Sequence, residues 1–188
     1  MKKIGILGGT FDPPHIGHLI IAEEVYQELG LDEVWFMPSN EPPHKSNAMA
    51  SGTDRLEMVE AAIQGNAHFR AVDFELKREG KSYTYDTIYH LKERYPSISI
   101  YFIIGGDMVE YLPRWHAIDK LLELVHFVGV NRKGHPLSSP YPVLEVEVPL
   151  IEVSSTDIRN RMKEGRNATY LLPDEVIHYI KGNHLYET

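Results

Sequence analysis

Residues 3–18 read KIGILGGTFDPPHIGH, and this stretch decides the fold. Residues 3–7 form an apolar run typical of a buried strand, and residues 18–29 place apolar side chains near one face of a helix. Gly8 and Gly9 lie between the two, where the backbone must turn tightly or approach a ligand. A strand, a glycine turn and a helix N-terminus together predict an anion-binding site.

The rest of the chain continues this alternation. Further strands are predicted at 33–37, 70–74, 99–104, 125–130 and 144–148, and further helices at 54–64 (capped by Thr53), 85–95, 119–124, 156–164 and 174–180. Strands separated by helices imply right-handed crossovers and a parallel sheet. We therefore expect an α/β fold, a single Rossmann-like domain over residues 1–188 with a mainly parallel sheet flanked by helices. Long irregular stretches at 38–52 and 131–141 are expected to be functional loops.

Composition excludes several classes of protein. The 188 residues suffice for one sizeable core, and the absence of cysteine excludes disulfide and thiolate chemistry. A net charge of −8 argues against nonspecific nucleic-acid binding. We find neither a secretion signal nor an apolar stretch approaching the ~20 residues that a membrane span needs. We expect a cytoplasmic protein that binds neither nucleic acid nor membrane, and a homo-oligomer is not excluded.

His15 and His18 stand three residues apart at the predicted helix start, so their side chains point the same way. Imidazole donors at that place suit phosphate oxygens. The alternatives are a plain glycine turn with surface histidines, or two metal ligands. No nearby carboxylate has an obvious zinc spacing, and we expect no metal bound by the protein.

The complete string from Gly8 to His18 resembles the phosphate-binding signature of the nucleotidyltransferase superfamily. The resemblance implies that ATP binds there and that His18 contacts the region of its α-phosphate. The ATP-binding residues implied in this string are Gly8, Gly9, Thr10, Phe11, His15 and His18.

A second motif, VSSTDIR at residues 153–159, places consecutive hydroxyl residues before a helix, with Arg159 one turn in. A capped helix with a solvated arginine is the alternative explanation. Paired with the first motif, this segment resembles the second signature of the same superfamily, which holds the β- and γ-phosphates. The resemblance implies ATP binding by Ser154, Ser155, Thr156 and Arg159. It also implies a catalytic set of His15, His18 and Arg159.

Three further motifs resemble the bacterial nicotinate-mononucleotide adenylyltransferases, and the likeness runs from residue 3 to about 186. They are PPHK at 42–45, SYTYDT at 82–87 and GGD at 105–107, the last followed by Leu112 and Trp115. The implied reaction is ATP plus nicotinate mononucleotide giving deamido-NAD and pyrophosphate, in NAD biosynthesis. The implied mononucleotide-binding residues are Thr10, Lys45, Thr84, Tyr85, Gly106, Asp107, Tyr111 and Trp115. Gly105, Asp107 and Arg132 join the ATP-binding set.

The chemistry of these residues supports the likeness. Free N–H groups at Thr84 and Tyr85, where a helix begins, suit the carboxylate of nicotinate. Trp115 offers a flat face for a pyridine ring, or belongs to the core. Lys45 is a mobile cation or a solvated loop lysine. Asp107 accepts from ribose hydroxyls or caps a helix.

One segment departs from the family. Where its members commonly show Ala-Arg-Pro-Gly, residues 131–134 read NRKG, which leaves the role of Arg132 open. Mg²⁺ is expected as a cofactor carried on the ATP phosphates, without a protein ligand. Three other activities stay open: a sister transferase acting on phosphopantetheine or a polyol phosphate, a nucleotide sensor without catalysis, and a metal hydrolase.

Overall fold

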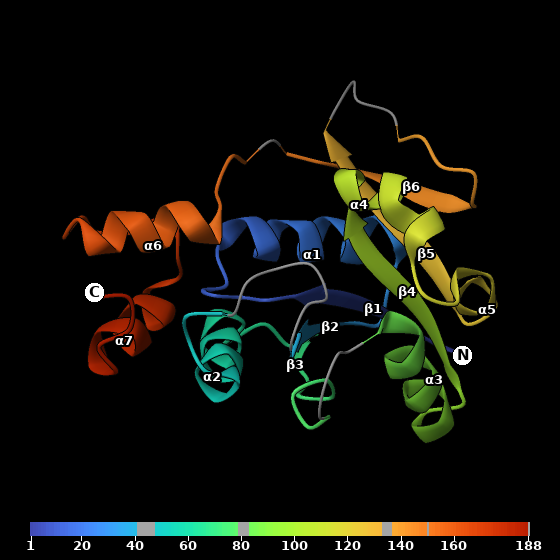
Figure 1. Ribbon diagram of the computed structural model, residues 1–188, viewed down its shortest axis with the longest axis horizontal. Coiled ribbons are helices and arrows are strands. Elements are labelled where there is room, and N and C mark those ends of the chain that lie inside the picture. The colour runs from blue at the N-terminus through green and yellow to red at the C-terminus, as the bar shows by residue number, and fades with distance from the viewer. Residues whose placement is uncertain (41–47, 79–82, 133–136, 150, 188) are drawn as a thin grey trace.

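The computed structural model of the chain describes residues 1–40, 48–78, 83–132, 137–149 and 151–187 (Figure 1). The strands are β1 (Lys2–Gly9), β2 (Glu33–Pro38), β3 (Phe69–Ala71), β4 (Ile98–Gly105), β5 (Val125–Arg132) and β6 (Val143–Val148). The helices are α1 (Ile16–Leu29), α2 (Gly52–Ala62), α3 (Thr84–Arg94), α4 (Gly106–Tyr111), α5 (Ile118–Leu122), α6 (Ser155–Lys163) and α7 (Asp174–Gly182), with a 3₁₀ turn η1 (Leu112–Arg114).

The six strands form one sheet in the order β3-β2-β1-β4-β5-β6, and every neighbouring pair is parallel. The expected α/β fold with a parallel sheet is confirmed. From β1 the sheet grows in one direction through β2 and β3 and in the other through β4, β5 and β6, so the strand order reverses between the neighbours β1 and β4. Ligands of open parallel sheets bind beyond the carboxyl ends of the strands at such a reversal. Gly8 and Gly9 end β1 at this place, and Gly105 ends β4 beside them.

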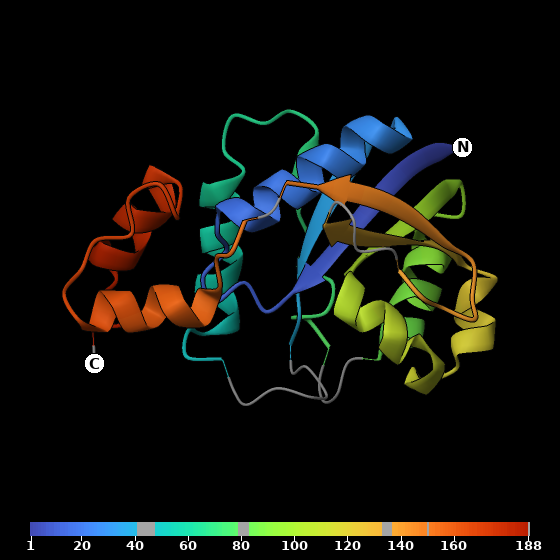
Figure 2. The same cartoon turned by 90° about the horizontal axis from the view of Figure 1, so that it is seen from above.

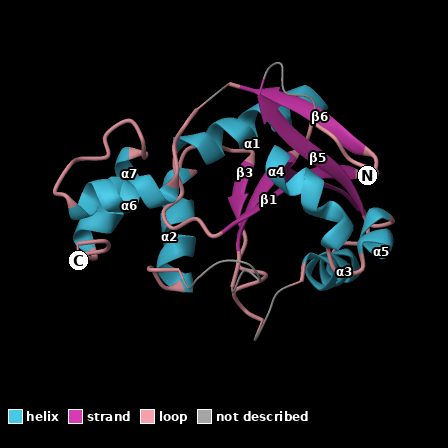
Figure 3. Ribbon diagram, turned by 45° about the horizontal axis from the view of Figure 1, so that its top comes forward, coloured by secondary structure: helices cyan, strands magenta, loops and turns pink. Residues whose placement is uncertain are grey.

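Helices cover both faces of the sheet (Figures 2 and 3). Side chains alternate along β1, so Ile4 and Ile6 join the core beneath α3, α4 and α5, while Leu7 joins the core beneath α1. The central strands are buried on both sides, which explains their continuous apolar sequence.

A third core lies away from the sheet, among α2, α6 and α7, which Figure 1 shows together at one end of the molecule. Met58 of α2, Ile158 of α6 and Ile180 of α7 are buried in it. Tyr186, near the end of the chain, belongs to the same core. This layer brings the second motif to the first, as described below.

Four details differ from the sequence predictions. Helix α2 begins at Gly52, and its cap is Ser51, whose hydroxyl accepts from the Asp54 N–H; Thr53 is not the cap. Strand β3 is only three residues long, because the chain turns soon after Ala71. Helix α1 begins at Ile16, two residues earlier than expected. Helix α4 and the η1 turn were not predicted. No helix in the described part of the chain is long and apolar enough to cross a membrane.

Candidate active site

Residues 8–18, called here the signature loop, pass from the end of β1 to the first turn of α1. Phe11 has a left-handed backbone (φ 52°), and its ring is buried against Gly9. A Cβ at Gly9 would lie 3.1 Å from that ring. The ring also meets His18 edge-on, with centroids 5.0 Å apart. Phe11 therefore supports the loop from inside, and only its main chain is available to a ligand.

His15 and His18 form one stacked unit. Their ring centroids are 3.8 Å apart, and the N–H of His15 donates to Nδ1 of His18 at 3.1 Å. Because Nδ1 of His18 accepts this hydrogen bond, a neutral His18 ring carries its own proton on Nε2. Burial lowers the pKa of His15 from 6.5 to about 4, so His15 is neutral near pH 7. The predicted pair is thus confirmed as neighbours, held by stacking and by the helix start.

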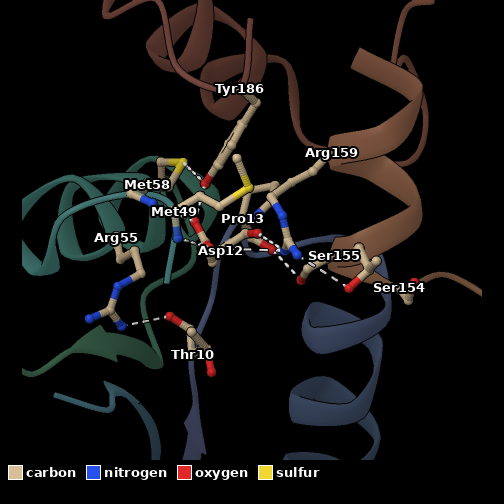
Figure 4. A network of polar contacts seen from close by, with 12 residues as sticks. Thr10, Asp12, Pro13, Met49, Arg55, Met58, Ser154, Ser155, Arg159 and Tyr186 are labelled. Carbon is tan, nitrogen blue, oxygen red and sulfur yellow. Dashed lines mark hydrogen bonds and ion pairs between the residues drawn. The ribbon is translucent and has the colours of Figure 1, made fainter. Parts of the chain in front are cut away.

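The second motif docks on the signature loop (Figure 4). The hydroxyl of Ser155 donates to the carbonyl of Pro13 at 2.8 Å. The guanidinium of Arg159 donates from Nη1 to the carbonyl of Asp12 at 2.7 Å and from Nη2 to Oγ1 of Thr156 at 3.3 Å. The structure therefore joins two motifs that lie at opposite ends of the sequence.

These contacts limit what the hydroxyls can offer a phosphate. Oγ of Ser154 accepts from the Asp157 N–H and donates to the Asp157 carboxylate, which makes it the N-cap of α6. Ser155 has a single O–H donor, and that donor binds the carbonyl of Pro13. A phosphate at this place would meet the N–H groups that begin α6, together with the remaining donors of Arg159.

Two buried charged residues, Arg55 beside the loop and Asp12 within it, were not among the predicted site residues. Arg55 of α2 is only 3% exposed and donates from Nη1 to the carbonyls of Thr10 and Ser39, both at 2.8 Å. Burial lowers the pKa of its guanidinium, and the Asp12 carboxylate nearby raises it. Asp12 is itself 3% exposed. The sequence held one indication that Arg55 is buried: it lies on the same face of α2 as the apolar residues Met58 and Val59.

A second group of side chains surrounds the start of α3, which begins at Thr84, one residue before the predicted 85–95 helix. The ring of His116 lies 4.7 Å from that of Tyr83 and 6.5 Å from that of Tyr85, measured between centroids. The first N–H groups of a helix have no partner within it, which is the reason a helix start suits an anion. His116 was not among the predicted residues.

Trp115 follows η1 and is half-buried. Its ring meets Phe102 and Phe127 edge-on, with centroids 6.0 and 5.8 Å away. Phe102 lies in turn beside Gly8, so Trp115 is linked to the signature loop through one ring. Tyr111 is 53% exposed, with the guanidinium of Arg114 over its ring. The part of the Trp115 side chain that packs against Phe102 and Phe127 therefore belongs to the core, which was the alternative expected for this residue.

Side chains lie close to the two glycines at the end of β4 and the start of α4. A Cβ at Gly105 would lie 2.8 Å from Oδ1 of Asp107, and one at Gly106 would lie 2.9 Å from Leu137. Gly105 is the N-cap of α4 and Asp107 lies in its first turn, where a carboxylate interacts favourably with the helix dipole. Asp107 is exposed at the carboxyl edge of the sheet, so it also remains accessible to a ligand.

Two predicted site residues cannot be placed. Lys45 lies outside the described residues. Arg132 ends β5, but its side chain is not described. The other predicted residues fall into three groups: the signature loop with the start of α6, the start of α3 with Trp115, and Gly105, Gly106, Asp107 and Tyr111 at the end of β4 and in α4. The first group can hold anionic oxygens, and the second combines an aromatic face with a helix N-terminus.

Comparison with known proteins agrees with this geometry. A cytidylyltransferase-like family model matches residues 6–161. The chain is 53% identical over 189 residues to the nicotinate-nucleotide adenylyltransferase of Bacillus subtilis (strain 168), with full coverage of both chains. It also has the fold of the Plasmodium falciparum nicotinic acid mononucleotide adenylyltransferase, solved in complex with NaAD (TM-score 0.82, 21% identity, 100% of this chain and 98% of that chain covered).

Proposed function

Because the chain belongs to the nicotinate-nucleotide adenylyltransferases of the cytidylyltransferase-like family, we propose that its site residues hold ATP and nicotinate mononucleotide for adenylyl transfer. The reaction gives deamido-NAD and pyrophosphate, a step in NAD biosynthesis. One observation carries the assignment of sites: the stacked His15–His18 pair and the start of α6 meet on the same signature loop.

The signature loop binds the reacting phosphate of ATP. The mononucleotide phosphate is anionic near neutral pH, so no side chain must deprotonate it before it attacks the α-phosphorus. Catalysis then consists of positioning two polyanions and stabilising the charge that develops toward pyrophosphate. His18 donates from Nε2 to the α-phosphate, because its Nδ1 is occupied by the His15 N–H. His15 holds that ring in place and stays uncharged.

The start of α6 binds the leaving group. Arg159 is fixed to the signature loop by its bond to the Asp12 carbonyl, and the N–H groups that do not bind Asp12 or Thr156 donate to phosphate oxygens. The N–H groups of Ser155 and Thr156 add the partial positive charge of a helix start. The protein carries a net charge of −8, so these local donors must outweigh a global field that repels anions.

The start of α3 and Trp115 bind the acceptor. The pyridine ring lies against the accessible part of Trp115, and its carboxylate accepts from the N–H groups at Thr84 and Tyr85. A neutral amide would forgo charge-assisted bonds of about 1.5–3 kcal/mol each. Preference for the acid over the amide therefore rests on backbone donors, so Thr84→Val should change it only modestly.

Mg²⁺ would be carried on the ATP by phosphate oxygens and water, and it would neutralise charge on the β- and γ-phosphates. We expect the enzyme to act in the cytoplasm on these small molecules.

Pyrophosphate release with ATP and a panel of acceptors tests the proposal. Nicotinate mononucleotide should give the highest kcat/KM, on the order of 10²-fold above nicotinamide mononucleotide. Phosphopantetheine and a polyol phosphate should give none. Equal efficiencies for the two mononucleotides would refute the carboxylate-binding role of α3, and turnover with phosphopantetheine would refute the acceptor assignment.

A further inference from the structure

The carboxylate of Asp12, inside the signature loop, is a meeting point for four separate segments (Figure 4). It accepts the N–H groups of Met49 and Ala50 at 2.8 and 3.1 Å. It also accepts the hydroxyl of Tyr186 at 2.5 Å, across 174 residues of sequence. Arg159 of α6 lies 3.9 Å away and donates to the main-chain carbonyl of the same residue.

Tyr186 reaches this carboxylate from the far end of the chain. Its side chain is 6% exposed and packs in the core shared by α2, α6 and α7. Its hydroxyl also lies 3.9 Å from the sulfur of Met58. Two residues here, His184 and Tyr186, have left-handed backbones (φ 53° and 61°). Non-glycine residues adopt that conformation at a cost, which persists only where surrounding contacts determine it.

The hydroxyl of Tyr186 is a donor throughout the working pH range. Burial and the Asp12 carboxylate raise the pKa of the phenol, so it stays protonated. An anionic oxygen buried beside a neutral donor and two backbone donors has a fixed orientation. Because side chain and carbonyl belong to one residue, a fixed Asp12 carboxylate also fixes the carbonyl that binds Arg159.

We propose that Tyr186 is a positioning residue for ATP, acting through Asp12 on Arg159. The proposal rests on the proposed function, because it concerns the phosphate group that Arg159 holds. Tyr186 touches no substrate. It orients Asp12, Asp12 orients the guanidinium, and the guanidinium meets the leaving pyrophosphate.

Tyr186→Phe tests the proposal, because it removes the donor and keeps the ring that packs in the core. The expected result is a fall of about tenfold in kcat/KM for ATP and a similar loss in calorimetric affinity for ATP, with the KM for the mononucleotide unchanged within about twofold. The matched control is Tyr179→Phe. Tyr179 of α7 also donates to an aspartate of α2, Asp54 at 3.0 Å, and the other carboxylate oxygen of Asp54 accepts from the hydroxyl of Ser51, the cap of α2. It should leave ATP binding unchanged.

A double-variant cycle separates positioning from general stability. In an Arg159→Lys background, Tyr186→Phe should cause no further loss of ATP affinity, while its effect on the melting temperature should stay the same. Additive losses in ATP affinity would overturn the proposal, and so would equal losses in the Tyr179 and Tyr186 variants. Calorimetry with ATP needs no acceptor, so wild-type protein that binds ATP but turns over no mononucleotide would overturn the proposed function alone.

Discussion

The buried His15 makes the stability of the protein depend on pH in a defined window. Its pKa is lowered from 6.5 to about 4 by burial, so the unfolded chain binds a proton more tightly than the folded chain does. Above about pH 6.5 His15 is neutral in both the folded and the unfolded state, so its lowered pKa does not change the free energy of unfolding there. As the pH falls from 6.5 toward 4, the unfolded state is stabilised by protonation, and the free energy of unfolding falls.

The size of the effect follows from the shift. One pKa unit corresponds to about 1.4 kcal/mol, so the full shift limits the loss to about 3 kcal/mol below pH ~4. At about pH 5 the loss attributable to His15 is about 2 kcal/mol. That is a large part of the roughly 5–15 kcal/mol that stabilises a typical domain.

Urea unfolding at about pH 7.5 and about pH 5 measures the effect in wild type and in His15→Asn. The variant keeps a residue suited to an N-cap but cannot titrate, so its loss of stability between the two pH values should be smaller by about 2 kcal/mol. His178→Asn, on the exposed face of α7, is the matched control and should behave as wild type. If His15→Asn kept the full pH dependence of wild type, the assignment of His15 as a buried neutral imidazole would be wrong.

Four further predictions concern single residues. His18→Ala should lower kcat by about 10²–10³ with little change in ATP affinity, because it removes one preorganised donor; a drop below about tenfold would return His18 to a structural role. Arg159→Lys should raise the KM for ATP about tenfold, since an ammonium cannot make the forked contacts, and an unchanged KM would leave the arginine without a phosphate role. Trp115→Ala should raise the KM for the mononucleotide, because the lost ring stacking is worth roughly 1–3 kcal/mol. If the variant changed only the stability of the protein, Trp115 would be a core residue. Gly129→Ala should lower the free energy of unfolding by about 1–3 kcal/mol, because its Cβ would lie 2.2 Å from Leu137, whereas Gly182→Ala, with open space around it, should be near neutral in urea unfolding.

The sequence predicted the fold because its signals are local and agree with one another. Strand and helix periodicity located the six strands and every helix except α4 and the η1 turn. Parallel pairing followed from their alternation, and the start of α3 at Thr84 lies one residue before the predicted 85–95 helix. The α4–η1 segment was missed because its short elements directly follow the apolar run of β4, and no break in the apolar pattern marks where the strand ends.

The motifs predicted which residues meet, but not how each is used. Stacking of His15 on His18 and the occupied hydroxyl of Ser155 depend on loop geometry that spacing does not encode. Arg55, Asp12 and Tyr186 are held in place by partners far away in the sequence, so no window of sequence contains both halves of those contacts. The burial of charge at these places results from the tertiary structure alone.

The third core, among α2, α6 and α7, is separate from the two cores that flank the sheet. We therefore expect α6 and α7 to open as a cooperative unit of their own. Small cooperative units open at lower free energy than the whole domain does. When this unit opens, Arg159 and Tyr186 leave the signature loop while the six strands stay paired. Amide hydrogen exchange should therefore be faster in α6 and α7 than in β1 and β4, and heat should abolish catalysis at a lower temperature than it disrupts the sheet.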